Sequence, residues 1–213
     1  MALQLLTPMS ILRKILITGT SSGLGEELFN QLKVTNDVIP LTRQNLDLSD
    51  IDSVQKYTIP RVDMLINCAG TDIGGKIEFV QHDSTSIVDI LNTNFIAPIL
   101  LTQKALVLNN QCKIVNITST NNKRYWPTDL SYSLSKKSLS IFGNMLQIEY
   151  PNLQYLEVVL GLTKTNFNLN RYKHNPTNID NLYSNPHLTT TDVVQQLMPI
   201  LWDNKIKSME ISP

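Results

Sequence analysis

Short apolar runs alternate with segments of helical periodicity along most of the chain. Near-continuous runs of Val, Ile and Leu are typical of strands buried on both faces, and apolar positions three and four residues apart are typical of helices. We expect strands over Lys14–Thr18, Val38–Leu41, Asn45–Leu48, Val62–Asn67, Lys113–Thr118, Gln154–Val159 and Met209–Ile211.

The expected helices fall between these strands. They cover Leu24–Val34, Ile51–Tyr57, Ser84–Leu91, Phe95–Leu108, Tyr132–Tyr150 and Asp192–Trp202. Strands that alternate with helices predict an α/β fold with a doubly wound parallel sheet, Rossmann-like, with a shortened C-terminal part. We expect one domain over residues 1–213. The Asn- and Pro-rich segment 161–190 would be a substrate-binding loop or lid within it, with at most one short helix.

Composition excludes several other classes of protein. With 213 residues, 42% of them hydrophobic, the chain can form a sizeable core. Eighteen basic residues balance eighteen acidic ones, which disfavours a sequence-independent nucleic-acid binder. Cys68 and Cys112 are too few for a disulfide framework, and the histidines His82, His174 and His187 are too scattered for a metal site.

The chain shows no targeting signal that we recognise. No uninterrupted run of about 18 apolar residues occurs, so we expect no membrane span. The apolar start Met1–Leu6 has no basic residues ahead of it and Pro8 follows closely, which is unlike a signal peptide. We therefore expect a cytoplasmic protein.

Three of the eight glycines lie within seven residues, between the first expected strand and the first expected helix. The segment Thr18–Gly25 reads TGTSSGLG. Glycine permits a tight turn and close approach of a ligand, and a helix N-terminus offers free N–H groups to a pyrophosphate. This position in the chain predicts a dinucleotide site, while the alternative is an ordinary strand–helix turn that is rich in glycine.

The segment TGTSSGLG resembles the TGxxxGxG cofactor motif of the short-chain dehydrogenase/reductase family. Asn67-Cys68-Ala69-Gly70 resembles the family's NNAG, with Cys68 in place of the second asparagine. The segment Tyr132–Lys136 matches YxxxK, and Asn94 and Ser119 stand where the family has its catalytic asparagine and serine. The resemblance covers about residues 13–165, and it rests on the joint order of the motifs.

The resemblance implies four catalytic residues, Asn94, Ser119, Tyr132 and Lys136. Tyr132 would pass a proton to or from the substrate oxygen. Lys136, one helical turn later, would lower the pKa of Tyr132 and hydrogen-bond the nicotinamide ribose. Ser119 would stabilise charge on the substrate oxygen, and Asn94 would support a water relay behind Lys136. Taken singly, Tyr132 could be a surface tyrosine and Ser119 a turn or cap residue.

The resemblance, together with the glycine turn and the end of the second expected strand, implies a set of cofactor-binding residues. They are Gly19, Ser21, Ser22, Gly23, Leu24, Gly25, Arg43, Asp47, Leu48, Asn67, Ala69, Gly70, Tyr132, Lys136 and Thr165. An acid at the end of the second strand would favour NAD(H), whereas Arg43 at that place can bind a 2′-phosphate, so we expect NADP(H). Arg43 could instead stack on the adenine or face solvent. Asp47-Leu48 could contact the adenine, or Asp47 could cap the helix at Ile51.

Substrate is expected beyond the carboxyl ends of the strands, between the segments 72–76, 120–130 and 162–188. Tyr125 and Trp126 could form an aromatic wall there, or a packed loop anchor. In the last two of these segments Lys123, Arg124, Lys164, Arg171, Lys173 and His174 outnumber Asp129 and Asp180. This excess favours an anionic substrate or nearby NADP phosphates, or is simply a solvated face.

These observations favour an NADP(H)-dependent oxidoreductase that interconverts a small-molecule carbonyl compound and its alcohol, with Tyr132 as general acid/base. The alternative is a non-catalytic NADP(H)-binding sensor or partner-binding module on the same fold. It is favoured by the shortened C-terminal part and by Leu160-Gly161, which replaces the family's Pro-Gly. A sugar-nucleotide epimerase is disfavoured, because the chain lacks a TGxxGxxG turn.

The resemblance also implies how two copies of the chain would associate. Members of the family often form dimers through the helices expected near 95–108 and 132–150. Ile141, Phe142, Met145 and Leu146 would supply apolar surface for this contact, or would pack only on the sheet. We expect a homodimer, and no nucleic-acid or membrane partner.

Overall fold

A single parallel sheet organises the molecule. The computed structural model describes residues 12–213 except 74, 76, 124–125 and 173–176. Its strands are β1 (Lys14–Thr18), β2 (Asp37–Leu41), β3 (Met64–Asn67), β4 (Lys113–Ser119), β5 (Tyr155–Leu160) and β6 (Ser208–Ile211). They pair in the order β2-β1-β3-β4-β5-β6, and every pair is parallel. The predicted doubly wound α/β fold is confirmed.

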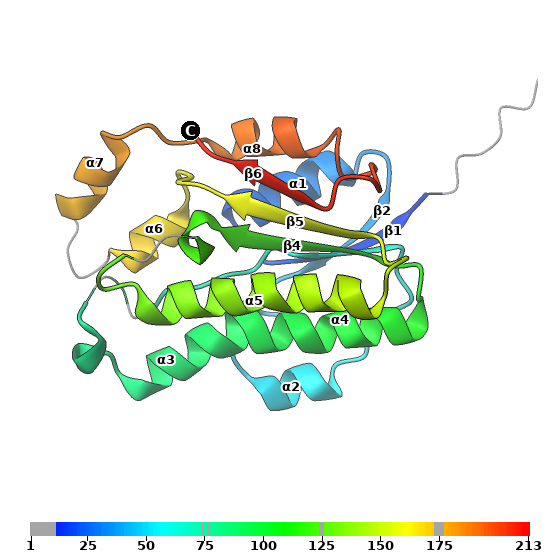
Figure 1. Cartoon of the computed structure of the whole chain (residues 1–213), viewed down its shortest axis with the longest axis horizontal. Coiled ribbons are helices and arrows are strands. Elements are labelled where there is room, and N and C mark those ends of the chain that lie inside the picture. The colour runs from blue at the N-terminus through cyan, green and yellow to red at the C-terminus, as the bar shows by residue number, and fades with distance from the viewer. Residues whose placement is uncertain (1–11, 74, 76, 124–125, 173–176) are drawn as a thin grey trace, which may run out of the picture.

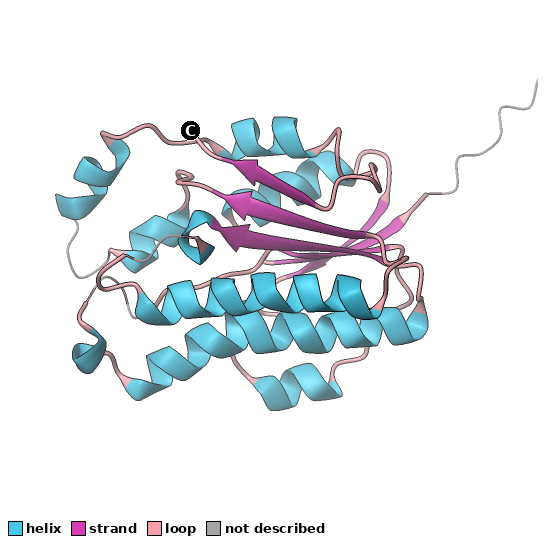
Figure 2. Ribbon diagram, viewed as in Figure 1, coloured by secondary structure: helices cyan, strands magenta, loops and turns pink. Residues whose placement is uncertain are grey.

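Helices cover both faces of the sheet (Figure 2). The α-helices are α1 (Gly23–Leu32), α2 (Ile51–Lys56), α3 (Ser84–Leu91), α4 (Ala97–Leu108), α5 (Leu130–Glu149), α6 (Asn166–Arg171), α7 (Thr177–Tyr183) and α8 (Thr190–Leu197). Short irregular turns complete them: η1 (Phe79–Gln81), the π-helical η2 (Asn92–Ile96) and η3 (Thr120–Asn122). In Figure 1, α1 and α8 lie on one face, and α4 and α5 lie on the other.

The alternation of side chains along the strands divides the core into two layers. Ile15 and Ile17 of β1 are fully buried on the face covered by α1 and α8. Leu16, between them in the sequence, is fully buried on the opposite face, together with Leu101 of α4 and Leu146 of α5. Strand residues that are apolar at every position therefore serve both layers, as expected for a covered parallel sheet.

Two features of the fold differ from the sequence prediction. The segment Asn45–Leu48 is a turn and not a strand. The side chain of Asn45 accepts a hydrogen bond from Thr42 N, and that of Asp47 accepts one from Ser49 N, so both hold the backbone in turns. The segment after β5 contains two short helices, α6 and α7, where at most one was expected.

The strand order changes direction beside β1. The chain passes from β1 to β2 on one side, then crosses back to place β3 on the other side of β1. In open α/β sheets, ligands bind at the carboxyl ends of the strands next to such a switch point. The ends of β1 and β3 carry the glycine turn and the Asn67–Gly70 segment, so the fold brings these two motifs together.

The continuous helical segment Ser84–Leu108 is long and apolar enough to cross a membrane by length and composition, with a mean hydropathy of 1.3 over an 18-residue window. The expectation of no membrane span rested on the lack of an uninterrupted apolar run, whereas this segment meets a criterion of mean hydropathy. The expectation therefore stays a prediction. In this fold α4 packs on the sheet, where Ala97, Leu101 and Ala105 are fully buried.

Candidate active site

The glycine turn after β1 lies directly against the segment that follows β3. Gly19 has φ +77°, in the left-handed region that favours glycine. A Cβ at Gly19 would lie 2.7 Å from Ala69 Cα, so any side chain there would collide with backbone. The Thr18 hydroxyl accepts hydrogen bonds from Cys68 N and Ala69 N, each at 3.0 Å. These contacts pack the backbone of Gly19 against Ala69, whose only side-chain atom is its Cβ, at the switch point.

The first turn of α1 completes the glycine turn. Ser21 and Ser22 are exposed, and Ser22 is the N-cap residue with no hydrogen bond from its side chain to the helix. A Cβ at Gly23 would lie 3.4 Å from Thr165 Cβ, which places Thr165 beside the glycine turn. Leu24 and Gly25 are buried, so only their backbone could take part in binding. The helix N-terminus therefore faces the same edge as Thr165.

The end of β2 lies next to the glycine turn, because Gly19 N donates to Leu41 O at 2.8 Å. Arg43 follows two residues later, with 65% of its side chain exposed and Asp47 Oδ2 at 3.7 Å from its Nε. Asp50, and not Asp47, caps α2 by accepting from Ser53 N. Hydrogen bonds from Ser49 and the charge of Arg43 lower the pKa of Asp47 against the opposing effect of burial.

Gly70 leads from the glycine turn to the catalytic candidates. A Cβ at Gly70 would lie 3.4 Å from Lys136 Nζ and 3.6 Å from Asn94 Oδ1, so all three residues converge. Lys136 is 4% exposed, and its Nζ donates to Ile117 O at 2.9 Å. Burial lowers the pKa of Lys136 to about 8. Leu48 and Asn67, which the sequence assigns to cofactor binding, are also buried. Asn67 Nδ2 donates a hydrogen bond to Asn116 Oδ1 inside the fold.

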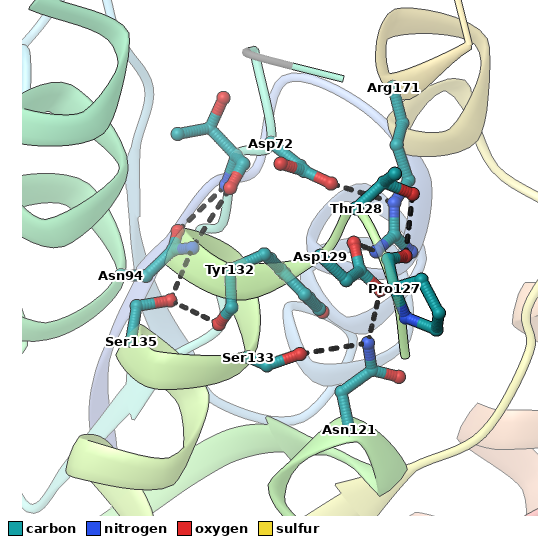
Figure 3. Close-up of polar contacts among 11 residues, drawn as sticks. Asp72, Asn94, Asn121, Pro127, Thr128, Asp129, Tyr132, Ser133, Ser135 and Arg171 are labelled. Atoms are coloured by element: carbon teal, nitrogen blue, oxygen red, sulfur yellow. Dashed lines mark hydrogen bonds and ion pairs between the residues drawn. The ribbon is translucent and has the colours of Figure 1, made fainter. Parts of the chain in front are cut away.

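Asn94 lies in the π-helical turn η2, a type of irregularity that is frequent at functional sites. Its Nδ2 donates to Thr71 O at 2.9 Å and to Ser135 Oγ at 3.0 Å, and its Oδ1 accepts from Thr71 N (Figure 3). Ser135 Oγ in turn donates to Tyr132 O at 2.7 Å. Asn94 thus joins the loop after β3 to the helix that carries Tyr132.

Tyr132 is buried, with 8% of its surface exposed, so it is not a surface tyrosine of α5. Burial raises its pKa to about 12, while the charge of Arg171 and a hydrogen bond from Ser119 act in the lowering direction. Ser119 ends β4, and its hydroxyl also accepts from Asn121 N at 3.2 Å, as a cap of η3 does. The structure brings Ser119 and Tyr132 together. A lowering effect of Lys136 on Tyr132 stays a prediction.

Three further residues at this site were not assigned to it by sequence motifs. Arg171, from α6, forms a buried ion pair with Asp72 Oδ2 at 2.7 Å from its Nε, and a second ion pair with Asp129 Oδ1. Its guanidinium carbon lies 4.9 Å from the centroid of the Tyr132 ring. These three residues are far apart in the sequence, and their spacing does not predict that they contact one another. The sequence indicates only that each lies in one of the three segments expected to surround the substrate.

The substrate side of the site carries fewer free charges than the sequence indicates. Arg171 has carboxylate partners, and Lys123 forms an ion pair with Glu210 at 2.6 Å. Trp126 is 52% exposed, while Tyr125 lies outside the described residues. Residues 124, 173 and 174 of the basic group also lie outside them.

The parallel sheet and the motifs gathered at its switch point define an α/β nucleotide-binding class of fold. Within that class, the family described as short chain dehydrogenase matches residues 41–176. The chain belongs to the short chain dehydrogenase family, which confirms both the resemblance and the prediction of an oxidoreductase.

Similar proteins extend over most of the chain. The NADP-dependent 3-hydroxy acid dehydrogenase of Schizosaccharomyces pombe is 26% identical over 87% of this chain and 85% of its own length. The 3-ketodihydrosphingosine reductase of Bacteroides thetaiotaomicron is 26% identical over 85% of this chain and 76% of its own length. A solved small-chain dehydrogenase in complex with NADPH has a TM-score of 0.81 at 21% identity, covering 94% of this chain and 97% of that one. At this identity, the last likeness shows the fold.

Proposed function

We propose that this oxidoreductase uses NADP(H) to interconvert a small carbonyl compound and its alcohol, with Tyr132 as the general acid/base. The observation that carries the proposal is the convergence of Tyr132 and Ser119 at the end of β4, one helical turn from Lys136, whose Nζ lies beside Gly70. A module that only binds a nucleotide has no chemical need of this arrangement, so we favour the enzyme.

The glycine turn fits a dinucleotide cofactor. Where Gly19 meets Ala69 the side chains are no larger than a methyl group, and α1 presents its N-terminus beside Thr165, which suits a pyrophosphate. Arg43, exposed at the end of β2, would bind the 2′-phosphate that distinguishes NADP from NAD. The NADP dependence named for the Schizosaccharomyces pombe relative supports the same choice. When bound, NADPH supplies a hydride to the carbonyl carbon of the substrate.

The chain's own residues manage the proton. With a pKa raised to about 12, Tyr132 is protonated at neutral pH and can donate its hydroxyl proton to the substrate oxygen during carbonyl reduction. Ser119 would hold that oxygen by a hydrogen bond and stabilise its developing charge. Lys136 would hold the nicotinamide ribose. Asn94, joined to the loop after β3, would support the water path by which Tyr132 regains its proton.

We extend the proposal to the surroundings of the site. The segment 161–190, with α6 and α7 beyond the carboxyl ends of β4 and β5, would be the substrate lid, and Trp126 would contribute to the wall opposite. Anionic substrates, and 3-hydroxy acids first among them, are the class to test, because a 26% identical relative is named for them. We also propose a cytoplasmic homodimer.

The test combines cofactor binding with turnover. Titration with NADPH and NADH, followed by nicotinamide fluorescence, should show tighter binding of NADPH, and Arg43→Ala should weaken NADPH binding about tenfold or more while sparing NADH. Turnover is then measured with NADP⁺ and a panel of 3-hydroxy acids that includes 3-hydroxybutyrate.

The second variant addresses chemistry alone. Tyr132→Phe should lower kcat by at least about a hundredfold with nearly unchanged NADPH affinity, because it removes the proton donor and little else. Wild-type turnover in Tyr132→Phe would exclude the proposed mechanism. NADPH binding without turnover on any carbonyl compound would favour the sensor alternative instead.

A further inference from the structure

A cation that contacts the ring of Tyr132 comes from α6 and not from a family motif. Arg171 is the last residue of α6, and only 11% of its side chain is exposed. Its guanidinium carbon lies 4.9 Å from the centroid of the Tyr132 ring, within the range of a cation–π contact. Phe167, one turn earlier on α6, packs against the same ring at a tilt of 50°, with centroids 5.4 Å apart. Helix α6 therefore covers Tyr132 with two side chains.

Two carboxylates from different parts of the fold fix Arg171 in this position. Asp72 belongs to the loop after β3 and lies 2.7 Å from Arg171 Nε. Asp129 is the N-cap residue of α5 and contacts Arg171 Nη2 (Figure 3). Asn121 Nδ2 donates to Asp129 Oδ2, which orients that carboxylate. Both side chains are at most 2% exposed, and a buried charge remains in place only when it is paired.

These contacts join the lid to the two walls of the site. Lysine could not replace arginine without loss here, because the planar guanidinium reaches both carboxylates at once and still lies over the phenol ring. We propose that Arg171 is a positioning residue for Tyr132: anchored by Asp72 and Asp129, it holds α6 across the phenol and keeps a fixed positive charge over it. The inference rests on the proposed role of Tyr132 as acid/base.

The electrostatic consequence has a definite sign. A positive charge near a phenol favours the phenolate, whereas a negative charge disfavours it. Arg171 accordingly acts to lower the pKa of Tyr132, and Asp72 and Asp129 act to raise it. Among the described residues, Lys136 lies one helical turn later on α5, and Tyr172, which follows Arg171, interacts with the same two carboxylates.

The pH dependence of alcohol oxidation measures this balance. Oxidation needs the phenolate, so kcat rises with pH over the range below the apparent pKa of the tyrosine, and this range is the rising limb. Arg171→Met should move this rising limb to higher pH by about one unit, because the cation is lost. Asp129→Asn should move it to lower pH. Arg171→Lys should leave it near the wild-type position while raising KM, because the charge remains but the double anchor does not.

Shifts of the rising limb in opposite directions in Arg171→Met and Asp129→Asn would distinguish a positioning role of Arg171 from a merely structural one. A damaged fold would lower kcat in both variants without displacing their limbs in opposite directions. Because Arg171→Met leaves two buried carboxylates without their cation, we also include Arg171→Met/Asp129→Asn, which removes one charge of each sign. Its limb should return towards that of the wild type. An unchanged limb in Arg171→Met, or equal shifts in Arg171→Met and Asp129→Asn, would overturn the electrostatic part of the proposal.

Amide hydrogen exchange of α6 tests the anchor without any turnover. Exchange over Asn166–Arg171 should become about tenfold faster in Arg171→Met, while exchange in α1 stays unchanged as an internal control. If the wild type oxidises no alcohol, the proposed function fails, yet faster exchange of α6 would still support the anchor. Unchanged exchange in α6 would overturn it whatever the activity.

Discussion

Two buried lysines, one at the amino ends and one at the carboxyl ends of the parallel strands, show how position decides the role of a charged residue. Burial lowers the pKa of both Lys113 and Lys136 to about 8. Lys136 lies at the carboxyl ends of the strands beside Gly70, where a cation has a proposed task. Lys113 begins β4 at the amino ends, where its Nζ donates to Asp203 O at 3.1 Å and to Asn204 Oδ1 at 3.4 Å. Only neutral oxygens accept these two bonds.

The lowered pKa of Lys113 gives stability a pH dependence. Between pH 8 and about 10.5 the unfolded chain binds the lysine proton more tightly than the folded one, so the free energy of unfolding rises with pH in this window. Lys113→Met should lose this contribution. We expect the stability of the wild type relative to Lys113→Met to increase by about 2 kcal/mol from pH 8 to pH 10, measured by urea unfolding.

An exposed lysine provides the control for this measurement. Lys14, on β1, has 44% of its side chain exposed and pairs with Asp37. Lys14→Met, which removes a lysine whose side chain remains in contact with water, controls for the general effect of losing one positive charge. Equal slopes for the two variants would mean that burial of Lys113 is not the cause.

At the same scale, the residues of the candidate site divide into those that a sequence can indicate and those that it cannot. Gly19, Ser119, Tyr132 and Lys136 stand in local patterns, tied to the end of a strand or to one turn of a helix, and the fold brings them together. Arg171 reaches Asp72 and Asp129 only because α6 folds back over the sheet edge. No local pattern in the sequence predicts such a contact. The count of basic and acidic residues in the segments expected to surround the substrate includes Arg171 only as one of six basic residues.

At the scale of the elements, the contact of α5 with β5 depends on one glycine. A Cβ at Gly143 would lie 1.8 Å from Tyr155 Oη and 2.3 Å from its Cζ, although alanine is otherwise the better helix former by about 1 kcal/mol. Tyr155 is fully buried, and its hydroxyl accepts from Asn116 Nδ2 at 3.4 Å, so the ring has little freedom to move. The close approach allows α5, which carries Tyr132 and Lys136, to lie directly on the sheet.

Gly143→Ala should therefore destabilise the protein by about 2 kcal/mol or more, despite the gain in helix propensity. The free energy of unfolding in urea measures this. In a Tyr155→Leu background the far end of the ring is absent, so the added cost of Gly143→Ala should fall below half. A gain in stability on Gly143→Ala in the wild type would show that the ring can yield, contrary to the packing described here.

The helices and strands match those predicted from hydrophobic periodicity wherever the contacts of the folded chain favour the same local structure. β1 and α3 begin and end at the predicted residues, because a continuous apolar run and an Asp83 cap mark them locally. The segment Asn45–Leu48 has the apolar spacing of a strand, since Leu46 and Leu48 are both buried. Its Asn45 and Asp47 side chains, however, bond to nearby backbone and close turns instead. Periodicity alone does not distinguish these outcomes.

At the scale of the whole molecule, α5 presents opposite faces to the sheet and to the outside. Leu139, Gly143 and Leu146 are buried against the core. The exposed apolar side chains recur on the other face and form a stripe: Leu130, Leu134, Ile141, Met145 and Ile148. Beside Leu134, an apolar groove lined by Val88, Phe95 and Ile96 continues the stripe towards η2. Contiguous apolar surface of this kind is typical of an interface.

A second copy of the chain is the occupant that we propose for this stripe, because the family resemblance places a dimer contact on these helices. Ile141→Glu/Met145→Glu should yield a monomer in sedimentation velocity, since burying two carboxylates in an apolar interface costs several kcal/mol. Its melting temperature should also lose the dependence on protein concentration that a dimer shows. Val34→Glu, an exposed apolar residue next to α1 on the opposite face, should leave the oligomeric state unchanged. If the wild type sediments as a monomer at micromolar concentration, the proposed dimer is wrong. The apolar stripe would then be solvent-exposed surface and not a dimer interface.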